Sequence, residues 1–370
     1  MLHFNNGTFK IMQIADIQED YPVNPDTIKL ISLALDREKP DLVVLTGDQI
    51  QGYSACYKKD ADKRTEAVIR SFITPMEERD IPFCITFGNH DDDGGVSKDK
   101  QINYYSSFSC ARFGAARSDD DKGTYSLQIF DSAKEKEIFN LYLIDSNKKE
   151  PDGAYSPVKK EQIEWYINER EALREKNGDY LPSFVFQHIP TPEFYDILIK
   201  CSKKDKNAVE AFKSRKNTFW KLDDKTISEG GFMYESPAVP EINTGEFDAL
   251  KEKGDVLGLF VGHDHINSFI INKDGVDLGY CQGAGFNTYG CGGKRGVRIY
   301  TLDENDIRNY NSYTVTMDEL CDFKPSRPVK EFVFTHMPTS LDEGFKLAKK
   351  AGIAIGTVAA VCIIGKNLIK

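Results

Sequence analysis

Several local patterns that would assign a function directly are missing from this chain of 370 residues. The eight cysteines are scattered without CxxC spacing, so a disulfide framework is not indicated. No GxxxxGK motif lies between a strand and a helix, so nothing supports nucleotide binding by a phosphate-binding loop. The N-terminus has no positive region followed by an apolar run of about 7 to 15 residues. We therefore expect no secretory signal and a cytoplasmic location.

The chain also has a deficit of positive charge. It contains 48 basic and 58 acidic residues, and the formal net charge of −10 argues against binding to nucleic acid or to an anionic membrane surface. An anionic substrate is still allowed, because bound metal ions can reverse the local sign of a site. The content of 40% hydrophobic and 29% charged residues is that of an ordinary globular chain.

Short apolar runs alternate with helical patterns, as expected when parallel strands are joined by crossover helices. Helices are expected after Asn24 and Pro25, which have the residue types of a helix cap and a first helical position, and at 61–79 and 161–176. Residues 91–123 are expected to form an elaborated surface loop around a short helix. Strands are expected at 9–15, 41–46, 82–87, 124–130, 138–144, 183–187, 256–261, 268–271, 276–280, 297–302 and 312–316.

Histidine is scarce, but four of the six histidines lie in polar loops that follow strand-like runs. The loops read IADIQ, LTGDQ, FGNHDDD, FQHIP and FVGHDH, and they contain Asp16, Gln18, Asp48, Asn89, His90, His188, His263 and His265. A carboxylate at the end of an apolar strand is costly unless it is paired with a cation. In open α/β sheets, ligands bind outside the carboxyl ends of the strands. We therefore expect these loops to converge on two metal ions with mixed nitrogen and oxygen ligands, with Asp48 shared between them.

The five loops, as DIQ, GDQ, GNHD, QH and GHDH, resemble those of the calcineurin-like metallophosphoesterase superfamily. Further segments, among them EKPDLVVLTGDQI, INTGEFDALKEKGDVLGLFVGHDHIN and YGCGGKRGVRIYTL, resemble its branch of plant and fungal purple acid phosphatase-like proteins. The resemblance covers about residues 9–317. It implies an α/β fold in which a two-sheet β-sandwich is flanked by helices.

The resemblance also implies a role for each loop residue. It assigns the first metal to Asp16, Gln18, Asp48 and His265, and the second to Asp48, Asn89, His188 and His263. It places His90 at the substrate, where an imidazolium stabilises phosphoryl charge and protonates the leaving oxygen. The implied cofactors are two divalent or mixed-valence ions, Mn, Fe, Zn or Mg, with a metal-bridging hydroxide as the nucleophile.

Two positions depart from the family pattern. Gln18 stands where most of the superfamily has histidine, which predicts a weaker or differently selective first metal site. Gln51 stands where purple acid phosphatases have a metal-binding tyrosine, and Tyr53 is out of register, so a purple tyrosinate-iron centre is not expected.

The expected activity is hydrolysis of phosphate monoesters, with a small phosphorylated molecule or a phosphoprotein as substrate. Phosphodiester hydrolysis by the same site is the alternative. A hypothesis of another class is a non-catalytic protein-interaction scaffold that binds metal, which the glutamine at position 18 allows. The sequence does not determine the oligomeric state.

Other polar residues near the motifs have simpler interpretations. Asp92 and Asp93 are expected to be solvated loop carboxylates, and Asp264 is expected to orient a neighbour rather than bind metal. The glycine-rich segment 283–293 is either a phosphate-binding loop or a plain hairpin loop. Asn267 is a candidate for the rim of the site.

The C-terminus is the last feature. We expect a catalytic domain at 1–322 and an extension at 323–370, in which residues 351–365 are almost entirely apolar and flanked by lysines. A helix of this length covers about 22 Å, against a bilayer core of about 30 Å. The segment is therefore either a short membrane anchor or a terminal helix.

Overall fold

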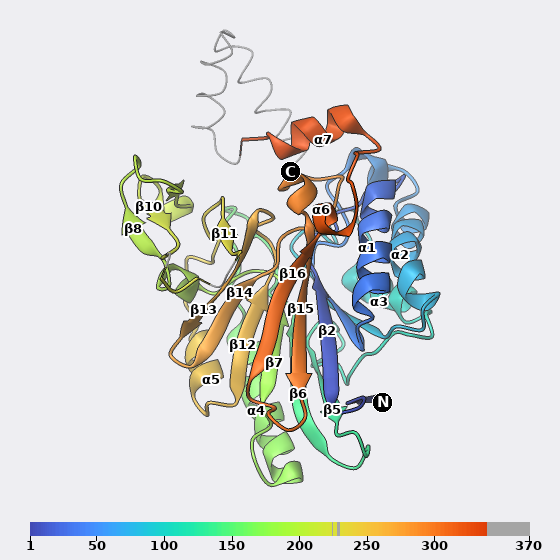
Figure 1. Ribbon diagram of the computed structural model, residues 1–370, viewed down its shortest axis with the longest axis vertical. Coiled ribbons are helices and arrows are strands. Elements are labelled where there is room, and N and C mark those ends of the chain that lie inside the picture. The colour runs from blue at the N-terminus through green and yellow to red at the C-terminus, as the bar shows by residue number, and fades with distance from the viewer. Residues whose placement is uncertain (224, 228–229, 339–370) are drawn as a thin grey trace.

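The computed structural model describes residues 1–223, 225–227 and 230–338, and the apolar segment 351–365 lies outside them. Two large β-sheets pack face to face, with helices on both outer faces (Figure 1). The expected two-sheet sandwich is confirmed.

The five-stranded sheet carries the first three ligand loops. Its order is β16 (Tyr310–Thr316), β15 (Gly296–Asp303), β2 (Thr8–Ile14), β3 (Leu42–Thr46) and β4 (Phe83–Thr86). Strands β2, β3 and β4 are parallel and are joined by α1 (Pro25–Glu38) and α2 (Ala61–Glu77), while α3 (Lys98–Tyr105) lies beside α2. The start of α1 follows the expected chemistry, because the Asn24 side chain accepts a hydrogen bond from the amide of Asp26.

The eight-stranded sheet carries the remaining loops. Its order is β1 (Leu2–His3), β5 (Tyr125–Phe130), β6 (Glu137–Ile144), β7 (Ser183–Gln187), β12 (Val256–Val261), β14 (Val276–Tyr280), β13 (Asn267–Lys273) and β11 (Phe232–Met233). Strands β6, β7, β12 and β14 are parallel. Helices α4 (Lys160–Asn177) and α5 (Glu246–Lys251) pack on the outer face of this sheet.

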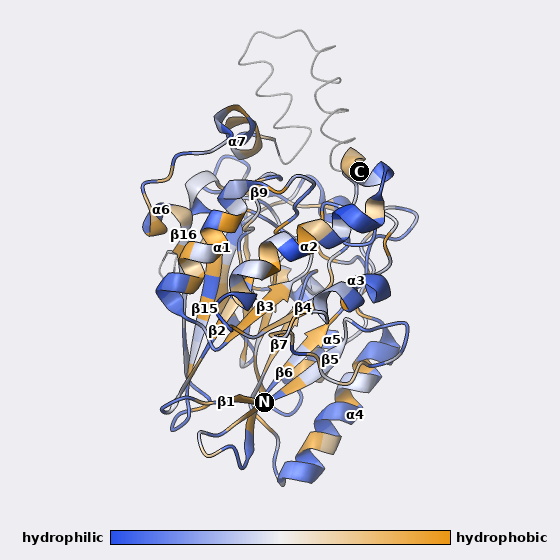
Figure 2. Cartoon of the chain, turned by 90° about the vertical axis from the view of Figure 1, so that its right-hand side faces the viewer, coloured by the Kyte–Doolittle hydropathy of each residue, from blue (hydrophilic) through white to orange (hydrophobic). Residues whose placement is uncertain are grey.

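Strand alternation distributes the side chains between two kinds of core. On β7, Phe184 and Phe186 point between the sheets, whereas Val185 points toward α4 and α5. On β2, Ile11 points between the sheets and Met12 points toward α1 and α2. The strands are accordingly hydrophobic on both faces, while the outward faces of the helices are polar (Figure 2).

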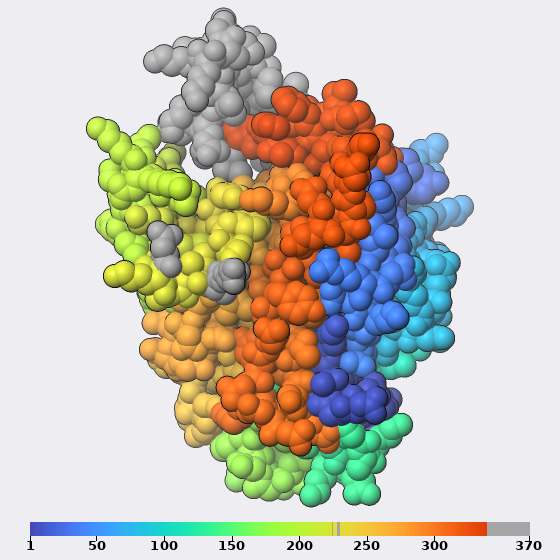
Figure 3. Space-filling model, viewed as in Figure 1, coloured from blue at the N-terminus to red at the C-terminus, as the bar shows by residue number. Residues whose placement is uncertain are grey.

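Every strand and helix expected from the sequence is present, with ends shifted by a few residues. Residues 189–255, for which the sequence predicted no elements, contain α5, β11 and a small sheet of β8 (Ile199–Cys201), β10 (Phe219–Lys221) and β9 (Val209–Glu210). Strands of two or three residues are too short to show a period. This small sheet forms a projection on the surface (Figure 3).

The start of the C-terminal extension packs against the sandwich. Helix α6 (Met317–Leu320) follows β16, and α7 (Pro328–Thr335) lies over the 283–293 segment. Glu331 of α7 forms an ion pair of 2.5 Å with the fully buried Arg295. Within the part of the chain that the structure describes, no helix is both long and apolar enough to cross a bilayer. The division at 322 remains a prediction.

Candidate metal centre

The ligand loops all lie at one edge of the sandwich, at the carboxyl ends of parallel strands. Two residues follow β2, one follows β3, two follow β4, one follows β7 and two follow β12; they are Asp16, Gln18, Asp48, Asn89, His90, His188, His263 and His265. Backbone hydrogen bonds join the loops, from Gln18 N to Asp48 O (2.8 Å) and from Gly262 N to His188 O (3.2 Å). All eight candidate residues are buried.

Glycine allows two of these loops to approach closely. Gly47 has φ +89°, and a Cβ added there would lie 2.6 Å from the amide nitrogen of Gly88. A Cβ at Gly88 would lie 2.2 Å from Asp48 Oδ1. The carboxylate of Asp91 locks the contact, because its Oδ2 accepts hydrogen bonds from the amides of Asp48 (2.9 Å) and Gly88 (2.7 Å). Asp91 is thus a structural residue of the site that we did not single out from the sequence.

Asp48, His188 and His263 form one set of ligand atoms, all within 4.8 Å of one another. His188 donates through Nδ1 to the carbonyl of Thr46 (3.0 Å), which leaves Nε2 facing Asp48 Oδ2 (3.3 Å) and His263 Nδ1 (3.2 Å). Neither atom of the nearby Asn89 amide has a hydrogen-bond partner, although the residue is buried. Buried polar atoms without partners are rare. This donor set fits a metal ion.

Asp16 and His265 form a second set. Asp16 Oδ1 is buried without a hydrogen bond and lies 3.3 Å from His265 Nε2. The opposite nitrogen, Nδ1 of His265, donates to the carbonyl of Tyr289 (3.0 Å), and the two rings stack at 4.2 Å. The other oxygen of Asp16 accepts from the His263 amide (2.9 Å), so the two sets are held together by backbone contacts.

Gln18 contacts the carboxylate of Asp48. Its Nε2 donates to Asp48 Oδ2 (2.7 Å), and its Oε1 accepts a hydrogen bond from the hydroxyl of Tyr53 (3.2 Å). In this orientation the NH2 group of the Gln18 amide faces the Asp48 carboxylate, and the amide oxygen points away from it. Only a reversed amide would present its oxygen to a metal ion. The set of Asp16 and His265 therefore offers a metal ion one carboxylate oxygen and one imidazole nitrogen, with Gln18 as a weaker contributor.

The charged groups of the site shift one another's pKa values. Burial alone would raise the pKa of Asp48, but the imidazoles of His188 and His90 hold it well below its usual value. Burial opposes the charge on His188, but Asp48 raises its pKa to about 9. Burial and the neighbouring His188 lower the pKa of His263 far below its usual value, so this imidazole is neutral and suited to bind metal.

His90 points to the same site but has a different set of contacts. Its Nδ1 lies 2.7 Å from Asp93 Oδ2, and its ring packs edge-on against Tyr53 at 4.7 Å. The backbone amide of His90 donates to Asp48 Oδ1 (2.8 Å). Asp93 is exposed, as expected for a solvated loop carboxylate, and the turn after His90 also brings its carboxylate onto the imidazole. Asp92 pairs with Lys148 (3.0 Å).

The structure also settles the other motif residues. Asp264 accepts from the Tyr280 hydroxyl (2.5 Å), so it orients a neighbour as expected. Asn267 is fully buried and accepts from the amide of Tyr234 (3.1 Å), so it does not line the rim. Three amides of the 283–293 segment donate to carbonyls of the ligand loops, which leaves them unavailable to a phosphate; they are those of Gly283, Ala284 and Gly285. Gln51 Nε2 donates to the carbonyl of Asn287 (3.0 Å).

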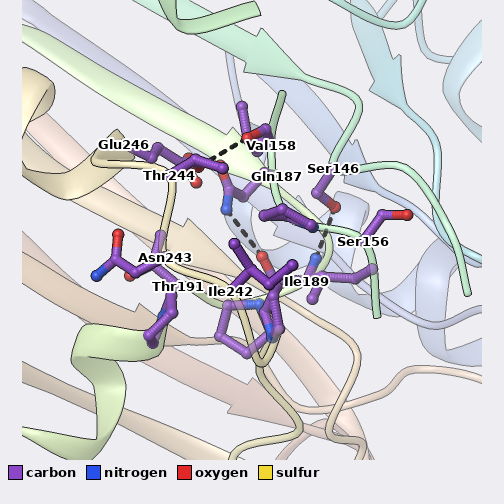
Figure 4. Close-up of a pocket in the computed structure, with 14 residues that line it drawn as sticks. Ser146, Ser156, Val158, Gln187, Ile189, Thr191, Ile242, Asn243, Thr244 and Glu246 are labelled. Carbon is purple, nitrogen blue, oxygen red and sulfur yellow. Dashed lines mark hydrogen bonds between the residues drawn. The ribbon is translucent and has the colours of Figure 1, made fainter. Parts of the chain in front are cut away.

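A separate small cavity lies at the end of β7, lined by Gln187, Ile189, Thr191, Ile242 and Glu246 among others (Figure 4). Its volume of about 10 Å³ suffices for a single water molecule. It is too small to hold a phosphate ester.

Comparisons with known proteins agree with this geometry. Residues 9–267 match the family described as calcineurin-like phosphoesterase. The chain is 30% identical to the Arabidopsis thaliana protein named "Probable inactive purple acid phosphatase 14", over 80% of this chain and 76% of that one. It is 28% identical to "Phosphatase DCR2" of Saccharomyces cerevisiae, over 86% of this chain and 56% of that one.

A solved structure shares the fold. A dimetal phosphatase from Danio rerio superposes with a TM-score of 0.50 and 13% identity, over 84% of this chain and 99% of that one. The family match spans all of the ligand loops, from Asp16 to His265, and the strands that carry them. The chain therefore belongs to the calcineurin-like phosphoesterase family.

Proposed function

We propose that this protein is a metal-dependent phosphomonoesterase. The observation that carries the proposal is the buried group of Asp48, His188 and His263, whose ligand atoms all lie within 4.8 Å of one another, with Gln18 Nε2 (2.7 Å) and His188 Nε2 (3.3 Å) both at Asp48 Oδ2. An oxygen in this position is suited to be shared by two cations. The proposed ligands are those expected from the sequence: Asp16, Gln18, Asp48, Asn89, His188, His263 and His265.

The chain's own residues would divide the work of phosphate ester hydrolysis. Two ions, when bound, would activate water near neutral pH and neutralise phosphoryl charge. Asp93 contacts Nδ1 of His90. The other ring nitrogen, Nε2, would therefore be available to donate a proton to the leaving oxygen of the substrate. Asp93 would act as a positioning residue, because a carboxylate on one imidazole nitrogen fixes the proton on that side and the orientation of the ring.

Two alternatives remain in view. Phosphodiester hydrolysis uses the same ligands and differs mainly in the residues around the site. A non-catalytic scaffold is favoured by two observations, the word "inactive" in the name of a relative and the hydrogen bond from Gln18 to Asp48. The name "Phosphatase DCR2" of another relative favours catalysis.

The test compares the protein with its His90→Ala variant on aryl phosphates and bis-aryl phosphates, with Mn, Fe, Zn and Mg supplied in turn. We expect metal-dependent turnover of the monoester, and a loss of about 100-fold or more in His90→Ala with metal content unchanged. His336→Ala is the control, because this exposed histidine directly follows α7 and its contacts among the described residues are with that helix. A scaffold would show no metal-dependent turnover in any form.

The same proposal covers location. The cytoplasm is the proposed compartment, with attachment to a membrane through residues 351–365 as the alternative. Fractionation of the full chain beside a version ending at Lys346 separates the two. Recovery of both forms in the supernatant would reject the anchor, whereas a full chain that sediments with membranes while the shorter form does not would support it.

A further inference from the structure

A platform of two aromatic rings adjoins the ligand set of Asp48, His188 and His263. The edge of Tyr155 packs against the ring of His263 with centroids 4.5 Å apart, and Phe212 packs against Tyr155 at 5.8 Å. The two rings come from distant parts of the chain, the loop after β6 and the segment after β9.

Each ring carries a lysine. Lys149 Nζ lies 5.3 Å from the centroid of Tyr155, and Lys213 Nζ lies 5.9 Å from the centroid of Phe212. Contacts of this kind are weak at exposed sites but hold an ammonium group over a ring face. The platform therefore brings two ammonium groups to the side of the metal centre where His263 lies.

Neither ammonium group has a carboxylate partner within the described residues. No ion pair involves Lys149 or Lys213 there, and the contact of Lys213 Nζ is with the carbonyl of Asp152 at 3.5 Å. The neighbouring Lys148 differs, because it pairs with Asp92 at 3.0 Å. Two lysines that lie beside a metal-binding site and have no carboxylate partner are suited to bind an anionic group of a ligand.

The electrostatics of the pair agree with this placement. Desolvation lowers the pKa of Lys149, and Lys213 lowers it further, whereas Asp48 and Asp93 act in the opposite direction. The two ammonium groups repel each other, and the charge of Lys149 reaches the carboxylate of Asp48. An anion held between the two lysines would relieve the repulsion.

We propose that Lys149 and Lys213 form a subsite for a second phosphate group of the substrate, next to the phosphate that is hydrolysed. The inference rests on the proposed function and narrows it to substrates with two phosphate groups. The two groups are either linked directly, as in pyrophosphate esters, or separated on one molecule, as in sugar bisphosphates. The shared chemistry is a second phosphate dianion within reach of the platform.

Binding is the first test, measured by isothermal titration on the full chain loaded with manganese. The probes are orthophosphate, inorganic pyrophosphate and fructose 1,6-bisphosphate. We expect at least one of the two larger probes to bind about 10-fold more tightly than orthophosphate. The probe that gains affinity identifies whether the linked or the separated arrangement is recognised.

The variants Lys149→Gln and Lys213→Gln remove one charge each, and Lys148→Gln is the matched control from the same turn. We expect each of the first two to reduce the preference over orthophosphate by about 3-fold to 10-fold, and Lys149→Arg to retain most of it. Lys148→Gln should keep the full preference. Equal affinities for all three probes in the unmodified protein, or an unchanged preference in a Lys149→Gln, Lys213→Gln double variant, would overturn the proposal.

Turnover of p-nitrophenyl phosphate, measured in parallel, separates this inference from the proposed function. Turnover without any preference for a second phosphate would remove the subsite and leave the phosphomonoesterase. A lysine-dependent preference without turnover would support the subsite on a protein that binds bisphosphates and does not hydrolyse them.

Discussion

At the scale of single residues, Gln18 is where we expect this chain to differ from its family. Its Nε2 donates to Asp48 Oδ2, the oxygen that also faces His188, and the hydroxyl of Tyr53 donates to the other end of the amide. A hydrogen-bond donor at this position competes with a cation for the same oxygen. We therefore predict that this residue weakens binding of the first metal.

Replacement of Gln18 by histidine tests this prediction. We expect Gln18→His to bind the first metal at least about 10-fold more tightly, because an imidazole nitrogen is a stronger ligand than an amide oxygen. Metal content after dialysis and titration with Mn and Zn would measure the change. Gln128→His, the same exchange on β5, is the control. Unchanged metal affinity, metal preference and turnover in Gln18→His would contradict the interpretation.

At the scale of elements, the site is a property of strand ends and the turns that follow them. Gly47 directly follows β3 and has φ +89°. Because it lacks a side chain, the backbone of Gly88, which follows β4, can approach it closely. Asp91 then fastens the two turns through backbone amides. Because β3 and β4 are parallel neighbours, the turns that follow them lie side by side, and Asp48 lies close to Asn89 and His90.

The variant Gly47→Ala should destabilise the protein by about 3 kcal/mol or more, because the added Cβ meets backbone atoms at a strained dihedral. Chemical denaturation measures the free energy of unfolding. Gly95→Ala is a matched control, since Gly95 has φ +83° with no atom within 4 Å of an added Cβ. We expect it to cost only about 1 kcal/mol. Similar losses in both variants would show that the dihedral alone matters.

Glu246, the first residue of α5, lies near the end of β7, and its buried carboxyl group predicts that stability depends on pH. Burial, and next Glu193, raise the pKa of Glu246 from 4.5 to about 8. The folded state therefore binds a proton that the unfolded state has lost, so stability falls as pH rises between about 4.5 and 8. The slope is on the order of 1 kcal/mol per pH unit.

Denaturation of Glu246→Gln at pH 5 and pH 8 checks this effect. We expect the variant to lose less stability over the interval than the unmodified protein, because its amide does not ionise. Glu161→Gln, an exposed position in the first turn of α4, should leave the pH dependence unchanged. An equal fall in the Glu246→Gln variant would assign the effect to other groups.

At the scale of the whole molecule, the C-terminal extension fastens onto the sandwich beside the proposed centre. Arg295 is fully buried, donates to the carbonyls of Gly285 (2.7 Å) and Thr288 (2.9 Å), and pairs with Glu331 of α7. This contact joins residues on both sides of the predicted boundary at 322. It couples the position of α7 to the loop behind Asp16.

Removal of the acidic partner should be costly. We expect Glu331→Ala to lower the free energy of unfolding by about 3 kcal/mol, because it leaves the guanidinium of Arg295 buried without a counter-charge. Glu66→Ala breaks the exposed pair with Arg70 and should cost below about 1 kcal/mol. Equal effects would show that α7 contributes little to stability.

The sequence by itself determined the fold class, the strand order along the chain and the identity of the loops that meet. These follow from local periodicity and from residue types at strand ends, which can be recognised in the sequence without knowing any tertiary contact. It did not reveal the bond between His90 and Asp93, the elements of 189–255, or the platform of Tyr155 and Phe212. The amide orientation of Gln18 and the placement of Lys149 and Lys213 on the platform were decided only by the tertiary structure. Gln18 meets Asp48 because β2 and β3 are neighbours in one sheet, and Lys149 and Lys213 come from segments that are far apart in the sequence, so local patterns could not reveal either contact.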